Sequence, residues 1–231
     1  MADLLWNLRD VRLKGDNADR LKNVSIDVMA GVTAVVGHSG AGKTSLLNLL
    51  AGLEKPDAGQ LTFVGREADS SAFSLPLFWV PQDGGLWPHM TARQQLAAVT
   101  ASADRDLKAG DDGESGNPID KLLNDFDLLH RRAAFPSELS KGEQSRLSVA
   151  RCLLANPAVM LMDEPFAHVD PERRPKYWAI VRQHLETQAA SLVFATHSPD
   201  DAMRESQYVI CPDGGRVIFA GQTTEFYADK L

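Results

Sequence analysis

Three glycines, a lysine and a threonine stand between two apolar runs in the segment VVGHSGAGKTSLLNLL, residues 35–50. Its spacing fits GxxxxGK[ST], the pattern of a loop that wraps phosphate between a strand and a helix. Glycine permits backbone conformations closed to other residues, so successive N–H groups can point at an anion beside the positive end of the helix. We expect Lys43 to reach the β- and γ-phosphates of a nucleotide and the Thr44 hydroxyl to ligate magnesium. The alternative is a flexible turn with a surface lysine. The residues expected to line the phosphate are Gly37, His38, Ser39, Gly40, Ala41, Gly42, Lys43, Thr44 and Ser45.

An acidic pair, Asp163 and Glu164, ends a second apolar run, VMLMDEP. Neighbouring side chains along a strand point in different directions, so the two acids can take different roles. We expect Asp163 to hold magnesium through water, and Glu164 to face the γ-phosphate and polarise the attacking water as a general base. The alternative is an acidic pair that only caps a strand before Pro165.

Short apolar runs alternate with longer helical patterns, which predicts a largely parallel sheet with helices on its faces. GVTAVVG, AVMLMD and SLVFAT are apolar almost throughout, as expected of central strands buried on both faces. VSIDV and QLTFVG alternate apolar with polar residues, which predicts a small antiparallel sheet within the first 65 residues. The helix after the glycine-rich segment is expected to bury Leu46, Leu47 and Leu50.

Composition limits the class of protein. The 231 residues, 44% hydrophobic and 24% charged, suit one sizeable α/β domain with a smaller appendage. No apolar run approaches the roughly 20 residues that cross a bilayer, and the amino terminus lacks a signal pattern, so we expect a soluble cytoplasmic chain. A net charge of -7 without a basic stripe argues against nucleic acid as a partner.

Other segments carry less chemistry. Residues 91–135 have a helical pattern, and the polar stretch at 102–118 predicts a surface loop. Cys152 and Cys211 lack metal-ligand spacing and are expected to be reduced, partly buried thiols.

With these motifs in place, the chain resembles the nucleotide-binding subunit of ATP-binding cassette (ABC) transporters over nearly its whole length. LSKGEQ at residues 139–144 is similar to the family signature LSGGQ, with Lys141 in place of a glycine. Ser140 and Gly142 are retained and can offer a hydroxyl and N–H groups to a phosphate. Ser140 and Glu143 also form an S-x-x-E capping box, which any helix can use.

The resemblance gives roles to three further residues. Gln82, in PQDGGLWPHMT, occupies the position of the Q-loop glutamine, a magnesium and water ligand, although a glutamine after a strand is usually only a polar loop residue. Asp170, in FAHVD, matches the D-loop acid and can equally cap a helix before Pro171. His197, after SLVFAT, matches the switch histidine at the γ-phosphate. The implied catalytic residues are Glu164, His197 and Gln82; the implied metal ligands are Thr44, Gln82 and Asp163; further nucleotide contacts are Ser140, Gly142 and Asp170.

The resemblance also implies a fold and a working assembly. The fold would be α/β, a P-loop NTPase core with a mostly parallel sheet, an N-terminal antiparallel β subdomain and an α-helical insert. A single domain would span residues 1–231, with the core at 1–90 and 156–231 and the signature-bearing helical subdomain at 91–155.

Two cassettes, identical or paralogous, would close over two Mg-ATP molecules and drive transmembrane subunits from the inner face of the cell membrane. LWPHMT, residues 86–91, resembles the stretch near the membrane subunit's coupling helix, with core packing as its alternative.

One departure from the family bears on the nucleotide base. Leu13 stands where the family stacks adenine on an aromatic ring, and Trp6 is too far upstream to replace it. Because a base-stacking contact is worth about 1–3 kcal/mol, modest nucleotide affinity or loose base preference is expected.

Two other functions stay open. A soluble cassette ATPase that clamps nucleic acid usually carries a coiled-coil insertion or a second cassette, and this sequence shows neither. A regulatory module with little turnover is made plausible by Lys141 and the missing ring.

Overall fold

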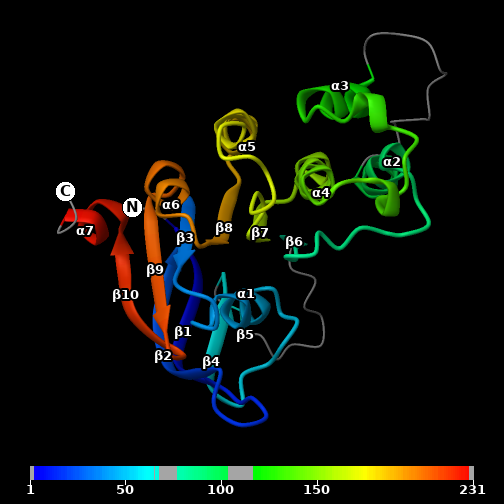
Figure 1. Ribbon diagram of the computed structural model, residues 1–231. Helices are drawn as coiled ribbons and strands as arrows, with labels where there is room; N and C mark the ends of the chain where they lie inside the picture. Colours follow the sequence, from blue (N-terminus) through cyan, green and yellow to red (C-terminus); the bar gives the residue numbers. More distant parts are fainter. Residues whose placement is uncertain (1–2, 65, 68–76, 104–116, 229–231) are drawn as a thin grey trace. The chain divides into compact units, whose positions relative to one another are not determined.

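A computed structural model describes residues 3–64, 66–67, 77–103 and 117–228 (Figure 1). Most of the surface loop predicted at 102–118 lies outside these residues. Contacts divide the chain into two compact units: unit 1 comprises Met1–Leu77, Leu161–Glu164 and Ser191–Leu231, and unit 2 comprises Phe78–Met160 and Pro165–Ala190. In the described part of the chain, no helix combines the length and the hydropathy needed to cross a bilayer.

One sheet of unit 1 is antiparallel, with the strand order β2-β1-β4-β5. Along β2, Val24, Ile26 and Val28 are buried while Ser25 and Asp27 are exposed, so the predicted alternation decides which face meets the core. This confirms the antiparallel sheet expected near the amino terminus. The strands are β1 (Leu4–Leu13), β2 (Leu21–Met29), β4 (Ala58–Phe63) and β5 (Arg66–Glu67).

The other sheet of unit 1 has the strand order β10-β9-β3-β8-β7. Strand β3 runs parallel to both β8 and β9, and β9 and β10 form an antiparallel hairpin. Strands β7 and β8 are buried at every residue, as expected of central strands of a parallel sheet. The predicted core is therefore confirmed. The strands are β3 (Val32–Val36), β7 (Val159–Asp163), β8 (Ser191–Thr196), β9 (Tyr208–Asp213) and β10 (Arg216–Gln222).

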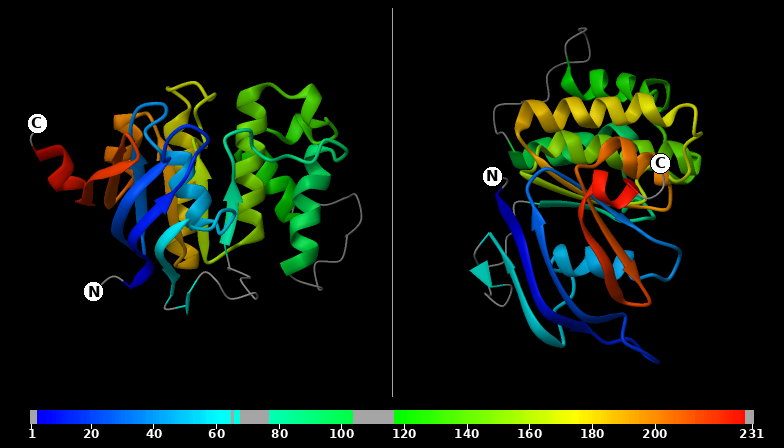
Figure 2. Two further views of the ribbon diagram at one scale, coloured as in Figure 1. Left: turned by 90° about the horizontal axis from the view of Figure 1, so that it is seen from below. Right: turned by 90° about the vertical axis from the view of Figure 1, so that its left-hand side faces the viewer.

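Helix α1 (Lys43–Leu50) packs between the two sheets of unit 1 (Figures 1 and 2). Its leucines at 46, 47 and 50 are buried as predicted, and Leu49 is buried as well. On the antiparallel side, the Nε1 of Trp6 donates to the Leu50 carbonyl (3.2 Å). Because both sheets contact α1, the position of its first residue, where the preceding loop ends, is fixed. Helices α6 (Pro199–Glu205) and α7 (Thr223–Tyr227) complete the unit.

Unit 2 is mainly helical, and it contains most of β6 and the first residues of β7, the strand that neighbours β6 in the sheet. Its core includes stacked and edge-on rings of Phe126, Phe166, Tyr177 and Trp178. Helix α5 belongs to this unit, and the predicted helical subdomain at 91–155 stays a prediction. The elements are β6 (Leu77–Val80), α2 (Ala92–Ala103), α3 (Pro118–Asp125), α4 (Lys141–Ala155), α5 (Arg174–Gln188) and the 3₁₀ turns η1 (Leu129–Arg131) and η2 (Pro136–Glu138).

Candidate active site

The glycine-rich segment forms the connection between β3 and α1 in unit 1. A Cβ on Gly37 would lie 2.9 Å from the Pro212 carbonyl, and Gly42, the N-cap of α1, has a φ of 111°. Neither position tolerates a side chain without strain. The first intrahelical bond of α1 runs from the Leu46 N–H to the Gly42 carbonyl, and no side chain caps the helix. The N–H groups at the start of α1 are therefore directed toward the loop, as an anion requires.

The Lys43 side chain turns back over this loop and is buried. Its ammonium donates to the carbonyls of Gly37 (2.8 Å) and His38 (3.1 Å) and lies 3.9 Å from a Glu164 carboxylate oxygen. The ammonium therefore lies beside the first residues of the loop. It can exchange two carbonyl oxygens for the more negative oxygens of a phosphate.

Thr44 and Asp163 meet in unit 1, where the end of β7 faces the first turn of α1. Thr44 Oγ1 donates to Asp163 Oδ2 (2.7 Å), and Asp163 is 2% exposed. Burial raises the pKa of Asp163, the Thr44 hydrogen bond opposes that rise, and the neighbouring Glu164 carboxylate adds to it. A hydroxyl and a carboxylate are hard oxygen donors, and a pair of them leaves room for phosphate oxygens and water, which suits Mg²⁺.

Glu164 and His197 lie beside this pair, also in unit 1. The Glu164 backbone has a φ of 52° and its N–H donates to the Ala195 carbonyl (3.1 Å). One carboxylate oxygen lies 3.2 Å from Nδ1 of His197, which follows β8. The structure thus gathers five residues singled out from the sequence, three from the ends of β7 and β8 and two from the first turn of α1: Asp163, Glu164, His197, Lys43 and Thr44.

A histidine contact that the sequence pattern did not reveal holds the outer side of the loop. His38 Nδ1 lies 2.8 Å from the Ser39 carbonyl oxygen and Nε2 lies 2.9 Å from Asp213 Oδ1. The bond to the Ser39 carbonyl, and then the Asp213 carboxylate, raise the pKa of His38. Asp213 was missed because it lies 175 residues away, and its only sequence signal is an acid before two glycines at the end of β9.

The signature segment opens helix α4 in unit 2. Ser140 is the N-cap: its hydroxyl accepts from the Glu143 N–H (3.3 Å) and its own N–H donates to Glu143 Oε2 (2.7 Å). The capping box considered as an alternative is therefore present. Lys141 is exposed, with its ammonium 3.4 Å from Gln144 Oε1. A Cβ on Gly142 would lie 2.8 Å from the His168 carbonyl oxygen, so glycine is required there by packing.

Gln82 and Asp170, which were predicted from the family resemblance, also lie in unit 2. Gln82 is exposed in the turn that follows β6. Asp170 Oδ1 accepts from the Glu172 N–H (3.1 Å), so this carboxylate caps the turn that leads into α5. In LWPHMT, Trp87 remains 37% exposed, whereas Leu86 and Met90 are half-buried.

Comparison with known proteins places this geometry in a family. The family model for ABC transporters matches residues 21–167, which include the phosphate loop, the signature and the acidic pair. The chain belongs to the ABC transporter family. The predicted family is thereby confirmed.

Relatives of the cassette are named as import ATP-binding proteins. It is 33% identical to the molybdenum import protein ModC of Paramagnetospirillum magneticum, over 95% of this chain and 61% of the relative. It is 35% identical to the Fe(3+) import protein FbpC of Serratia marcescens, over 93% and 62%. For the sulfate/thiosulfate import protein CysA of Thermosynechococcus vestitus the identity is 32%, over 90% and 61%. The cassette thus spans about three fifths of the length of these relatives.

Solved structures support the fold. An ATP-binding subunit of an ABC transporter superposes with a TM-score of 0.79 at 20% identity, covering 98% of this chain and 93% of the other. The cbiO1 protein of Clostridium perfringens, part of the complex cbiONQ, gives 0.77 at 24% identity, covering 99% and 92%. The predicted α/β fold with an antiparallel β sheet and helices is confirmed.

Leu13 and Trp6, the two residues considered for adenine stacking, present no exposed ring. Leu13 is buried, and Trp6, buried as well, packs against Phe63 with ring centres 4.9 Å apart. Trp6 is therefore a core residue of unit 1.

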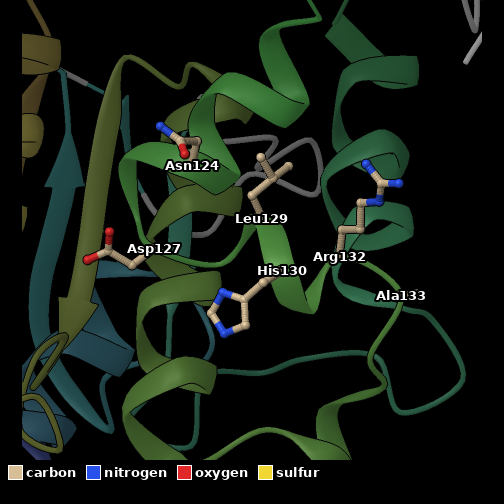
Figure 3. Close-up of a pocket in the computed structure, with 6 residues that line it drawn as sticks. All are labelled: Asn124, Asp127, Leu129, His130, Arg132 and Ala133. Atoms are coloured by element: carbon tan, nitrogen blue, oxygen red, sulfur yellow. The ribbon is translucent and has the colours of Figure 1, made fainter. Parts of the chain in front are cut away.

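A hollow of about 650 Å³ in unit 2 involves none of the predicted nucleotide ligands (Figure 3). Its wall runs from the end of α3 through η1 to the residues directly after η1. The lining residues are Asn124, Asp127, Leu129, His130, Arg132 and Ala133. The phosphate loop, in unit 1, is thus a better candidate than this hollow for the nucleotide site.

Proposed function

We propose that the cassette hydrolyses ATP and thereby powers an ABC importer. The observation that carries the proposal is the gathering of Lys43, Thr44, Asp163, Glu164 and His197 at one end of the phosphate loop in unit 1. A cation, two metal-ligand groups and an oriented carboxylate are the parts that phosphoryl transfer to water needs, because that reaction depends on positioning and charge neutralisation.

Each of these residues has a distinct task in the proposed reaction. The amides of the loop and Lys43 hold the β- and γ-phosphates in line with the attacking water. Glu164 accepts a proton from that water, and the 3.2 Å contact with His197 keeps its carboxylate aimed. His197, half-exposed at the end of β8, is free to turn its other ring nitrogen toward the γ-phosphate.

Thr44 and Asp163 would hold Mg²⁺, with Gln82 as a further ligand. When bound, the metal neutralises negative charge on the phosphate oxygens. The hydrogen bond of Thr44 to Asp163 keeps both oxygen atoms at the site before the metal arrives. The roles of Gln82 and Asp170 rest on the family resemblance, since both lie in unit 2.

The proposed active form contains two cassettes, each completing the nucleotide site of the other with Ser140 and Gly142. Support comes from the α4 N-terminus, where the capping box fixes the Ser140 oxygen and leaves its proton free to bond a phosphate. A solved structure of similar fold is a dimeric cassette bound to ADP and Pi.

Membrane subunits are the proposed partners, reached from the inner face of the membrane. Trp87 and Phe135 expose 37% and 40% of their surfaces in unit 2, and large exposed rings favour a protein contact. The relatives are named for import of molybdenum, Fe(3+) and sulfate or thiosulfate, so import is the shared element. We expect Trp87→Ser to weaken co-purification with a multi-spanning subunit, whereas Met203→Ser, an exposed apolar residue of unit 1, should not.

Phosphate release from ATP by the purified chain tests the central proposal. The rate should depend on Mg²⁺, disappear in Lys43→Ala, and fall per chain on dilution, because separated cassettes lack the second half of each site. A chain that releases no phosphate under any of these conditions would contradict the ATPase assignment. A rate per chain that is constant across all dilutions would contradict the shared site.

A further inference from the structure

Arg151, on helix α4, contacts the segment that follows β6 in unit 2. The residue is 3% exposed, and its Nη2 donates to the carbonyls of Gly84 (3.2 Å) and Gly85 (2.8 Å). The guanidinium also lies 4.5 Å from the centre of the Trp87 ring, a cation–π contact. Burial lowers the pKa of Arg151. A guanidinium is costly to bury, and these contacts offset part of its loss of water. Its buried Nε has no hydrogen-bond partner among the described residues.

Gln95, on helix α2, ties Arg151 to the backbone of Trp87. Its Oε1 accepts from the Trp87 N–H (3.1 Å) and from Arg151 Nη1 (3.0 Å), while its Nε2 donates to the Trp87 carbonyl (2.9 Å). The amide side chain carries both the donor and the acceptor that this pairing requires. Both backbone polar groups of Trp87 are therefore bound to one fully buried side chain that is itself bound to Arg151.

The same segment rests directly on α4. Gly84 is buried with a φ of 82°, and a Cβ there would collide with the Ser148 hydroxyl. The Gly84 N–H donates to the Pro81 carbonyl (2.8 Å), which closes the turn that contains Gln82. The turn of Gln82, the exposed ring of Trp87 and the helix that begins at the signature are thus joined around one guanidinium.

We infer that Arg151 is a positioning residue that makes the Gln82 turn, Trp87 and α4 move as one piece. A partner that displaces Trp87 then displaces Gln82 and the signature end of α4 with it. The inference rests on the proposed function, which gives Gln82, Trp87 and Ser140 their roles.

Arg146 offers a matched control on the same helix. It is 8% exposed and also spans buried polar groups, donating to the Phe126 carbonyl (2.7 Å) and the Tyr177 hydroxyl (3.1 Å). Arg151→Lys and Arg146→Lys keep a charge but lose the planar fork that reaches several acceptors. Both changes should lower the thermal midpoint, so thermal stability alone does not distinguish a positioning role from a packing role.

Hydrogen exchange and magnesium dependence separate the two roles. In Arg151→Lys, amides of residues 82–90 should exchange about 10-fold faster, since hydrogen bonds that hold this segment are lost. The Mg²⁺ concentration for half-maximal hydrolysis should rise about 5-fold while ATP binding in EDTA is unchanged. Arg146→Lys should leave the exchange of residues 82–90 at the parental rate. The exchange measurement is the matched comparison, because Arg146 Nε also donates to the Gly142 carbonyl (3.3 Å). If Arg151→Lys does not fold, Gln95→Glu is the replacement. It removes the donor to the Trp87 and Met90 carbonyls and places a carboxylate oxygen against them, so it should speed exchange around Trp87.

Equal changes in the two arginine variants, or unchanged exchange at residues 82–90, would overturn the inference. A parental chain without ATPase activity would contradict the proposed function and the catalytic half of the inference. The exchange comparison, which needs no nucleotide, would still decide whether Arg151 anchors the segment.

Discussion

Nδ1 of His197 lies 3.2 Å from Oε2 of Glu164. The other carboxylate oxygen of Glu164 lies 3.9 Å from the Lys43 ammonium, so the carboxylate is held from two sides. The backbone contributes as well, since the Glu164 N–H is bound to the Ala195 carbonyl. Orientation of the carboxylate is thus set by groups of unit 1.

Glu164→Gln tests the general base. We expect hydrolysis to fall about 10²- to 10⁴-fold, the usual range for a lost general base, with ATP binding retained because the amide keeps the shape of the side chain. Phosphate release and equilibrium binding of labelled ATP measure the two effects. Glu186→Gln, an exposed residue of α5, is the control. Hydrolysis at the parental rate in Glu164→Gln would refute the base assignment.

Lys43→Ala tests the phosphate contact. The ammonium binds only backbone carbonyls at the loop and lies near Glu164, so its loss should spare the fold. Because a charge-assisted bond is worth about 1.5–3 kcal/mol, ATP affinity should fall at least about 10-fold. Titration with labelled ATP and far-ultraviolet circular dichroism check both expectations, and Lys14→Ala, on an exposed residue, is the control. An unchanged affinity for ATP would contradict the proposed contact between Lys43 and phosphate.

Asp163→Asn should separate stability from activity. Burial raises the pKa of Asp163, so the folded state disfavours its ionised form relative to the unfolded state. The free energy of unfolding therefore falls as the pH rises from the unfolded pKa of Asp163 to its folded pKa. The amide variant should therefore unfold at a higher temperature than the parent at pH 7, lose this advantage below the unfolded pKa of 3.8, and lose Mg²⁺-dependent hydrolysis. A lower midpoint at pH 7 would show that the Thr44 bond outweighs burial.

Asp127→Asn should have the opposite pH dependence. Hydrogen bonds from Lys176 and Tyr177 and the charge of Lys176, together with Arg173, lower the pKa of Asp127 to about 2 against the opposing effect of burial. This stabilisation is full above the unfolded pKa of 3.8 and is lost as the pH falls toward 2. With the side chain about one third exposed, we expect a loss of about 1 kcal/mol at pH 7, measured by urea unfolding. The difference from the parent should narrow as the pH falls from about 4 to about 2. Asp125→Asn, whose carboxylate pairs only with the exposed Lys121 one helical turn away among the described residues, should show little change.

Local patterns explain which parts of the site were predictable. The phosphate loop follows from glycine spacing between an apolar strand and a helix, and Asp163 and Glu164 follow from their place at the end of a buried strand. The contact between His38 and Asp213 joins segments 175 residues apart and has no local pattern. The same holds for the bond between Arg151 and Gln95, because its geometry depends on how α2 packs on α4. The capping box at Ser140 shows why the two interpretations of the signature were hard to separate, since one hydroxyl can accept from the helix and donate elsewhere.

The close approach of Gly142 to the His168 carbonyl changes what that glycine signifies. A neighbour in its own chain excludes any larger residue, so selection for folding alone is enough to preserve it. Paralogues that have lost turnover would retain this glycine unaltered. The presence of this glycine in a sequence is therefore not, by itself, a sign of ATPase activity.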